Sequence, residues 1–429
     1  MINSNHCRSI ALSAVVTLAA GTALLTLSSC AFAKPEIAKK DKEANKKKEA
    51  NKKQDDKDKK TDKKADTKDY EAKTRKLISD LRSRGKQSLL RTQLSELAQY
   101  LFDHGRAIEA EPLYEEAVKL AESDSSGDRA ALALLLNDAG ANYWETGKYN
   151  ESEACYKKSI PLYEELLKEA SPAKDLQSGY VCVLTNLGNT YETLGDYDQA
   201  VATYQKALDY GKANLGATNS NAIDALEGIG VVYEDQEKAG KAEPYLLEAL
   251  KLREASVGQS KLDGTLISLA CVNLDLRDYQ AAQRHLERAL KIQEKLHGKE
   301  HPAIADTLIQ LATLAQSREQ YDLAKQHLQR CISIREKLLG KNHFHTALAL
   351  NNLAYVYQLE TDYPSALALY KRAVAICEKA FGDDAKNLNV ANVYSCYASL
   401  LYRMNRVEDA ESMKSRSQQI RDRMTAGTD

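Results

Sequence analysis

The chain of 429 residues carries 60 Lys and Arg against 61 Asp and Glu, so its formal net charge at pH 7 is only −1. Such a balance gives no general attraction to nucleic-acid phosphates, and we expect no nucleic-acid partner. The charge is nevertheless uneven. Residues 34–68 carry 15 Lys and 9 acidic residues, a net of +6, and Arg8 adds +1 before them, which leaves −8 for residues 69–429.

Residues 1–33 have the layout of a secretory signal peptide. Arg8 precedes the uncharged apolar run IALSAVVTLAAGTALLTL at 10–27. LSSC (27–30) resembles a bacterial lipobox, which would make Cys30 a lipidated amino terminus, whereas AFA (31–33) fits ordinary cleavage before Lys34. An uncleaved anchor is less favoured, because 18 apolar residues are short for a bilayer span. We therefore expect an exported protein of the bacterial periplasm or cell envelope, or a secreted one.

Residues 34–68 are rich in Lys and nearly free of apolar side chains, so they cannot bury enough surface to fold. We predict a disordered linker. Its interleaved acids favour a solvated spacer over a segment that grips anionic lipid, cell-wall polymer or nucleic acid. A membrane tether through Cys30 or through this linker remains open.

The remainder is built from a repeated sequence, with a capping helix expected over 69–86 and repeats over 87–428. An anchor pattern, as in GDYDQAVATYQKAL (195–208), recurs with steps of 42, 48, 42, 40, 42, 42 and 44 residues. Its central small residue falls at Ala110, Ser152, Ala200, Ala242, Ala282, Ala324, Ala366 and Ala410. A fixed period of this length indicates a solenoid.

The pattern predicts two helices in each repeat, and each helix has one buried apolar stripe, such as Leu308, Leu311, Ala312 and Ala315. Gly or Ala stands where the two helices are expected to cross, because a larger side chain would overpack the contact. The 48-residue step carries an insertion at 167–180 whose Ser-Pro and Gly predict a longer loop. Residues 391–424 carry Lys414 and Ser417 at apolar positions and predict a polar end cap.

The small residues at the helix crossing, the anchor alanines and the tyrosines of this pattern resemble those of the tetratricopeptide repeat. The 42-residue period, GKEHP (298–302) and LNNLA (350–354) are similar to the kinesin-light-chain variety, over about four-fifths of the chain. The resemblance implies an all-α, right-handed superhelix of about eight helix pairs that serves as a protein-binding scaffold. Kinesin light chains are cytosolic motor adaptors, so the secretory leader argues against that particular role.

No motif predicts catalysis, a cofactor or a metal. GANYWETGK (140–148) has six residues between its glycines where a phosphate-binding loop needs four. His301 and His343 occupy equivalent inter-repeat turns without acids or Cys at metal-ligand spacing. The cysteines after the leader form no C-x-x-C pair, and no base is placed to activate one of them.

A concave face lined by first helices is the expected binding surface. An amide side chain can both donate to and accept from a peptide backbone. In kinesin light chains the asparagines of the LNNLA motif contact cargo peptide, so the resemblance suggests this role for Asn351 and Asn352 and for the matching asparagines. The first helices of the third to sixth repeats have no Lys or Arg in their middles. Their acidic residues predict that the bound peptide is neutral to basic; these residues are Glu192, Asp224, Glu227, Glu234, Asp235 and Asp306. The candidate peptide-binding residues are Asn137, Asn186, Asn189, Glu192, Glu234, Asn351 and Asn352.

The sequence therefore predicts an exported, non-catalytic protein-interaction scaffold that binds an extended peptide or a partner helix. Two alternatives remain. One is an accessory subunit of an envelope enzyme, or an enzyme itself, with a site that no motif reveals. The other is a structural protein that assembles with itself.

Overall fold

The computed structural model describes residues 70–124, 128–168, 172–256, 261–382 and 387–425. The predicted signal peptide, Cys30 and the Lys-rich segment 34–68 lie outside the described residues. The described chain forms two compact units, the first ending at Ile229 and the second beginning at Gly230. Each unit is considered by itself below.

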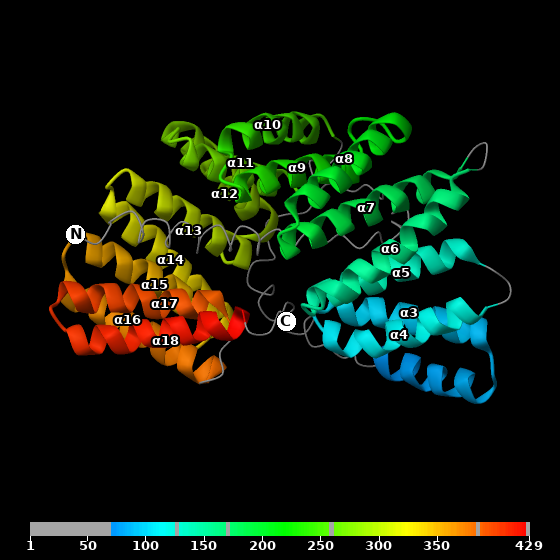
Figure 1. The fold of residues 1–429 in the computed structure, drawn as a ribbon, viewed down its shortest axis with the longest axis horizontal. Helices are drawn as coiled ribbons and strands as arrows, with labels where there is room; N and C mark the ends of the chain where they lie inside the picture. Colours follow the sequence, from blue (N-terminus) through cyan, green and yellow to red (C-terminus); the bar gives the residue numbers. More distant parts are fainter. Residues whose placement is uncertain (1–69, 125–127, 169–171, 257–260, 383–386, 426–429) are drawn as a thin grey trace, which may run out of the picture. The chain divides into compact units, whose positions relative to one another are not determined.

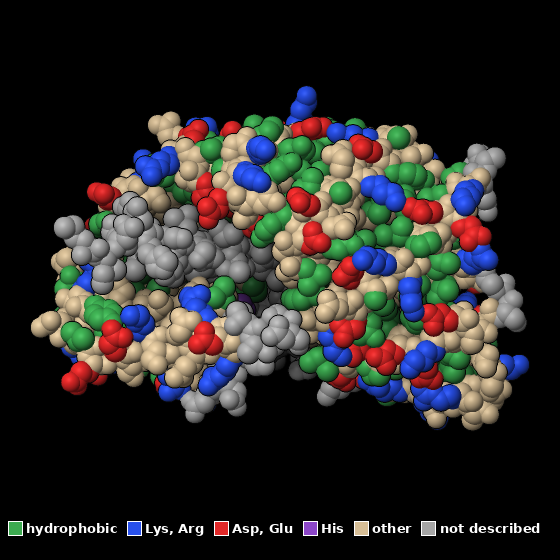
Figure 2. Space-filling model, in the orientation of Figure 1, with side chains coloured by type: hydrophobic (Ala, Val, Ile, Leu, Met, Phe, Trp, Pro, Cys, Tyr) green, Lys and Arg blue, Asp and Glu red, His purple; other side chains and the backbone are tan. Residues whose placement is uncertain are grey.

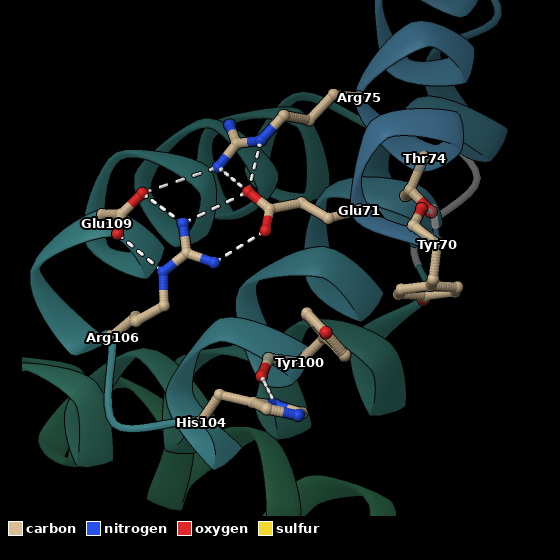
Figure 3. Close-up of polar contacts among 8 residues, drawn as sticks. All are labelled: Tyr70, Glu71, Thr74, Arg75, Tyr100, His104, Arg106 and Glu109. Carbon is tan, nitrogen blue, oxygen red and sulfur yellow. Dashed lines mark hydrogen bonds and ion pairs between the residues drawn. The ribbon is translucent and has the colours of Figure 1, made fainter. Parts of the chain in front are cut away.

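The first unit is a series of antiparallel helix pairs. It contains a helix over residues 70–83, then α3 (Gln87–Asp103), α4 (Ala107–Ser123), α5 (Arg129–Glu145), α6 (Tyr149–Leu166), α7 (Lys174–Leu194), α8 (Tyr197–Asn214) and most of α9 (Ser220–Asp235) (Figure 1). The helix over 70–83 is joined to the first pair by a polar cluster, in which Arg106 contacts both Glu71, at 2.6 Å, and Glu109, at 2.7 Å (Figure 3).

The second unit repeats the same arrangement. After the end of α9 it contains α10 (Ala239–Ala255), α11 (Leu262–Asp275), α12 (Tyr279–His297), α13 (Pro302–Ser317), α14 (Tyr321–Leu339), α15 (Phe344–Leu359), α16 (Tyr363–Phe381), α17 (Leu388–Arg403) and α18 (Val407–Thr425). The expected all-α repeat solenoid is confirmed, and every central small residue of the anchor pattern lies on a second helix with no exposed surface.

Every pair makes its internal turn in the same way. The residue five positions before the anchor has a left-handed backbone, with φ between 58° and 78°. In the first three pairs it is Gly105, Gly147 and Gly195. In the last five pairs it is Glu237, Arg277, Glu319, Thr361 and Asn405. A side chain disfavours this conformation, so the later turns are more strained than the earlier ones.

The crossing within each pair is also constant. A Gly or Ala of the first helix always stands 12 residues before the anchor, as Gly188 does before Ala200. The expected reason was close approach of two backbones, but at Gly188 the space is taken by a ring. A Cβ there would lie 2.5 Å from the ring of Tyr204, and a Cβ on Gly228 would meet the same ring. The glycines therefore hold a fully buried tyrosine.

The prediction of a loop over 167–180 is wrong for the second half of this insertion. Residues 174–180 belong to α7, which has 21 residues and begins at Lys174. Gly179 lies within this helix, where an added Cβ would come within 2.6 Å of the Tyr163 hydroxyl. Helical hydrogen bonds satisfy the extra backbone, which a loop would leave to solvent.

The last helix departs from the expected polar cap at one residue. Lys414 is exposed, as expected of an end surface, but Ser417 is buried. Its hydroxyl donates to the Ala391 carbonyl at 2.8 Å, as Ser159 does to Ala133 in α6 at 2.7 Å. A small hydroxyl thus replaces the alanine found at this position in most other pairs.

Candidate functional site

The first helices of each unit form its inner face. Consecutive first helices touch directly, α3 with α5 and α5 with α7 in the first unit, and α11 with α13 and α15 with α17 in the second. Consecutive second helices make no comparable contact among the described residues. Each stack therefore curves toward its first helices, which is the surface that repeat proteins use for binding.

The outer second helices are linked by a regular series of ion pairs. Basic residues six positions after the anchor reach an acid on the preceding second helix: Lys206 to Glu164 at 2.7 Å, Arg330 to Glu294 at 2.6 Å and Arg372 to Glu336 at 2.6 Å. Charged side chains of both signs are interspersed over the surface seen in Figure 2. Exposed pairs of this kind stabilise little, but they neutralise the outer face.

The inner helices have the opposite composition. Residues 92–103, 130–145 and 175–194 of the first unit contain no Lys, Arg or His. They contain Glu96, Asp103, Asp138, Glu145, Asp175 and Glu192. In these ranges every charged side chain is acidic, whereas the second helices carry acids and bases together; the basic residues of α3, α5 and α7, which are Arg91, Arg129 and Lys174, lie within the first five residues of these helices.

Two of the predicted asparagines of the first unit contact each other. Asn186 of α7 donates to the side-chain oxygen of Asn137 at 3.0 Å, and Asn137 donates to Asp138 at 3.3 Å. Asn137 and Asn186 are 4% and 9% exposed. Because Asn137 both donates and accepts within the protein, it has little capacity left for a peptide backbone.

Asn189 and Glu192 are joined through a tyrosine. The Tyr204 hydroxyl lies 2.6 Å from Asn189 Oδ1 and 2.8 Å from Glu192 Oε2. A buried tyrosine needs such a partner for its hydroxyl. These two predicted residues are therefore close together on α7 and have an internal structural contact.

Three acids on this face were not among the predicted site residues. The pKa of Asp138 is raised to about 7, chiefly by burial, with a further contribution from Asp103 and an opposing hydrogen bond from Asn137. Burial also raises the pKa of Glu145. No described Lys or Arg pairs with Asp103, Asp138 or Glu145. The sequence signal was LNDAG itself, where attention to the asparagine left its acidic neighbour aside.

Two further side chains of α5, Asn142 and Trp144, lie close in sequence to Asp138 and Glu145. Asn142 is 1% exposed, and neither of its amide atoms has a partner among the described residues. It stands four positions after Asp138, on the same side of the helix. Trp144, the single tryptophan of the chain, donates to the Thr193 hydroxyl of α7 at 3.3 Å.

The second unit places its predicted asparagines differently. Asn351 of α15 donates to Asn352 at 3.4 Å, matching the step from Asn137 to Asp138. The Asn351 side-chain oxygen, however, is buried without a donor among the described residues. The residue of α17 at the position of Asn186 is Cys396, which has no amide to offer. Gln310 of α13 likewise has a buried oxygen without a described donor.

The acidic character of this face is weaker in the second unit. Glu234 is buried, and burial raises the pKa of its neighbour Asp235 to about 6. Asp306, expected to contribute negative charge, is paired with the buried Arg335 at 2.7 Å. α15 and α17 carry no acid. The inner face therefore changes from acidic in the first unit to amide-rich toward the end of the second.

Arg335 belongs to a set of buried polar residues eleven positions after the anchor. It also donates to the His345 carbonyl of α15 at 2.6 Å, and so joins α13 to α15. Gln293 does the same one pair earlier, donating to Asp263 at 3.0 Å and accepting from Thr307 at 2.7 Å. These contacts are structural bridges between consecutive pairs.

The remaining polar candidates have local roles. His301 and His343 are N-cap residues whose rings accept from the backbone N–H groups of Ala303 and His345. Among the described residues, no three His, Cys, Asp or Glu side chains are grouped to hold a metal ion. Burial raises the pKa of the Cys155 and Cys331 thiols to about 11, which opposes thiolate chemistry. None of the helices described is long and apolar enough to cross a membrane.

Family comparison identifies the class of protein. The tetratricopeptide-repeat model matches residues 88–165, 180–255, 264–337 and 305–379, which together make up more than half of the chain. The chain therefore belongs to the tetratricopeptide repeat family, and a protein-interaction role follows from that membership.

Similarity to kinesin-light-chain relatives is confirmed. Protein KINESIN LIGHT CHAIN-RELATED 2 of Arabidopsis thaliana is 24% identical over 215 residues, covering 49% of this chain and 32% of that protein. Photosystem I assembly protein Ycf3 of Prochlorococcus marinus is 33% identical over 93 residues, covering 21% of this chain and 46% of that protein. The match thus spans less than half of either relative.

Solved structures show the same fold. The quorum sensor NprR from B. thuringiensis aligns with a TM-score of 0.55 at 15% identity, covering 81% of this chain and 92% of that one. Aspartyl phosphate phosphatase F from Bacillus subtilis aligns with a TM-score of 0.53 at 14% identity, covering 70% and 74%. At these identities the likeness concerns the fold alone.

Proposed function

We propose that the protein is a non-catalytic scaffold that binds an extended peptide or a partner helix on its inner face and prefers neutral to basic segments. The observation that carries this proposal is the separation of charge. Basic residues of the second helices are paired with acids on the outer face, whereas residues 92–103, 130–145 and 175–194 of the first helices carry acids and no Lys, Arg or His. A cationic segment would be steered to such a surface and would supply the missing counter-charge.

The amides of the second unit suit the backbone of an extended peptide. The oxygens of Asn351 and Gln310 are buried acceptors without described donors. A peptide N–H would satisfy them and offset the cost of leaving them unpaired. Asn351 and Gln310 are therefore the residues for which we propose backbone contacts, ahead of Asn137, whose amide is used internally.

The test uses one extended peptide in acidic, neutral and basic versions. We would measure its affinity for the full chain by fluorescence anisotropy, with Trp144 emission as a reporter on α5. Asp138→Asn with Glu145→Gln should weaken binding of the basic version about tenfold, and that of the neutral version little. The matched control is Glu151→Gln with Asp198→Asn, which removes two exposed charges from second helices. Preference for the acidic version would contradict the proposal.

We also propose that the protein is exported through residues 1–33. This rests on the charge and apolar pattern of the leader alone. Mass spectrometry of the amino terminus from a bacterial host would distinguish lipidated Cys30 from a terminus at Lys34, with Cys30→Ala as the control. Recovery of the uncleaved chain from the cytosol would contradict export.

A further inference from the structure

Three second helices of the second unit are longer than the first helices with which they pair. α12, α14 and α16 have 19 residues each, whereas α11, α13 and α15 have 14, 16 and 16. Each of the three begins three residues before its anchor, as the second helices of the first unit do, so the additional residues lie at the carboxyl end. In the first unit no second helix exceeds its partner by more than one residue. The last turn of α12, α14 and α16 therefore extends past the first helix of its pair.

The apolar stripe of α12 and α14 continues into this last turn. Leu296 and Leu338 stand 14 positions after their anchors Ala282 and Ala324. That spacing is about four helical turns, so both leucines lie on the side of the helix that is buried elsewhere. Leu339 follows directly. The side chains of Leu296, Leu338 and Leu339 are nevertheless 65%, 44% and 42% exposed, because no first helix covers them.

Positive charge surrounds these leucines. We define the overhang as Leu296, Leu338 and Leu339 together with the exposed lysines of the same helix ends and loops, which are Lys295, Lys299, Lys337, Lys341 and Lys379. Lys337 pairs with Glu300, but the other four lysines make no ion pair with a described residue. The acids of the last turns, Glu294 and Glu336, pair with arginines of the following second helices. The overhang therefore combines uncovered apolar side chains with uncompensated positive charge.

Neighbouring parts of the overhang are held side by side. Arg330 of α14 donates to the Lys299 carbonyl at 3.4 Å, and Arg372 of α16 donates to the Lys341 carbonyl at 3.2 Å. Lysines at the carboxyl end of a helix also suit its dipole. The dipole gives no reason for leucines that project into solvent, and a role in packing would have buried them. The leucines therefore indicate a partner outside the chain.

The form of the overhang indicates the class of partner. A partner helix binds in an apolar groove, whereas these leucines project from the ends of two helices. Projecting apolar side chains flanked by lysines suit the boundary between the anionic headgroups and the acyl chains of a bilayer. We propose that the overhang docks the second unit on an anionic membrane surface, with the leucines inserted among the headgroups and the lysines bound to the lipid phosphates and carboxylates. This role is independent of the inner face on which the proposed function rests.

The first test measures binding to vesicles by sedimentation. It uses the mature chain that begins at Lys34, without the apolar leader or a lipid, and vesicles of phosphatidylcholine with about 30% phosphatidylserine. Leu296→Ser with Leu338→Ser should lower the affinity about tenfold. The matched control is Leu247→Ser with Leu323→Ser, at leucines that are 47% and 39% exposed outside the overhang, and it should bind as the natural chain does. Residues 34–68 are present in every variant, so any binding by their lysines is common to all.

The second test separates the charge of the overhang from its apolar side chains. Lys295→Gln with Lys341→Gln should also weaken binding about tenfold at low salt, and should make little difference near 1 M salt. The control is Lys251→Gln with Lys371→Gln, at exposed lysines of α10 and α16. Vesicles of phosphatidylcholine alone should bind the natural chain weakly.

The third test reports insertion directly. Leu338→Trp in a Trp144→Phe background places the single tryptophan of the chain in the overhang. Lipids that carry bromine on their acyl chains should quench its emission about twofold, and should not quench that of Leu247→Trp in the same background. Equal vesicle binding by the natural chain and the double-serine variant, without quenching at position 338, would assign lipid binding to residues 34–68 and overturn the proposal. Absence of vesicle binding, with dimers that the double-serine variant abolishes, would overturn it in favour of a second copy of the chain.

Discussion

The two units build the same helix pair with different residues. In the first unit the internal turns use Gly105, Gly147 and Gly195, and in two of its three complete pairs a glycine at the crossing makes room for a tyrosine ring. In the second unit all the complete pairs have a non-glycine residue at the turn and alanine at the crossing. The first unit thus gains tight ring packing and unstrained turns, whereas the second replaces them with buried polar bridges such as Arg335. The repeat constrains backbone geometry more strictly than residue type.

The largest expected effect concerns the bridges of the second unit. Arg335→Leu removes the partner of Asp306 and the donor to the His345 carbonyl. We expect a loss of about 3 kcal/mol in the free energy of unfolding, because a partly buried carboxylate and a buried carbonyl lose their donor. Urea denaturation would measure it. Adding Asp306→Leu should recover much of the loss, and a failure to recover would show that the arginine acts by packing instead.

The second largest effect is expected for Gly188, at the helix crossing in the first unit. Gly188→Ala places a Cβ 2.5 Å from the Tyr204 ring, and we expect a loss of about 1 to 3 kcal/mol from overpacking. The control is Gly264→Ala in α11, where no atom lies within 4 Å of the new Cβ. There, helix propensity alone should stabilise by up to about 1 kcal/mol. Thermal denaturation would show shifts of opposite sign, and equal shifts would argue against the ring contact.

The third prediction concerns pH. In the folded chain burial raises the pKa of Asp138 from its ordinary 3.8 to about 7. Between these values the folded chain binds more protons than the unfolded one, so stability falls as pH rises from about 4 through 7. Asp138→Asn should remove this fall, a change of about 1 to 2 kcal/mol because the carboxyl is only partly buried. Urea midpoints at pH 5 and 8 would test it, and an unchanged pH dependence would contradict the assignment.

The smallest effect compares the turns. Thr361 holds φ at 66°, which is unfavourable for a β-branched residue. Thr361→Gly should therefore stabilise by about 1 kcal/mol or less, and Gly195→Ala, in the equivalent turn of the first unit, should destabilise by a similar amount. Matched urea midpoints would measure both. Destabilisation by both changes would mean that the threonine side chain contributes contacts that outweigh its strain.

Much of the fold could be predicted because the anchor residues are repeated and their burial is local. The eight anchors, the turn at Gly147 and the N-cap histidines all follow from positions that the sequence shows directly. The second half of the insertion was misassigned because Gly is typical of loops, whereas Gly179 lies within α7, against the ring of Tyr163.

The site was less predictable, because charge on a helix says nothing about its partner on another helix. The charge of Asp306 could not be recognised as paired without Arg335, which is 29 residues away. Asn137 and Asn186 are 49 residues apart, and their contact depends on how α5 and α7 stack. Asp138 became a candidate only when its burial and the absence of a described cation were known.

The constant 12-residue spacing between the crossing residues has a consequence for how such chains vary in length. The distance between anchors ranges from 40 to 48 residues, but the distance within a pair does not change. Additions and deletions are therefore confined to the junctions between pairs, as the lengthening of α7 illustrates. An epitope or a fluorescent protein inserted at a junction should leave the neighbouring pairs folded. An insertion inside a pair would separate the crossing residue from its anchor and disrupt the packing of that pair.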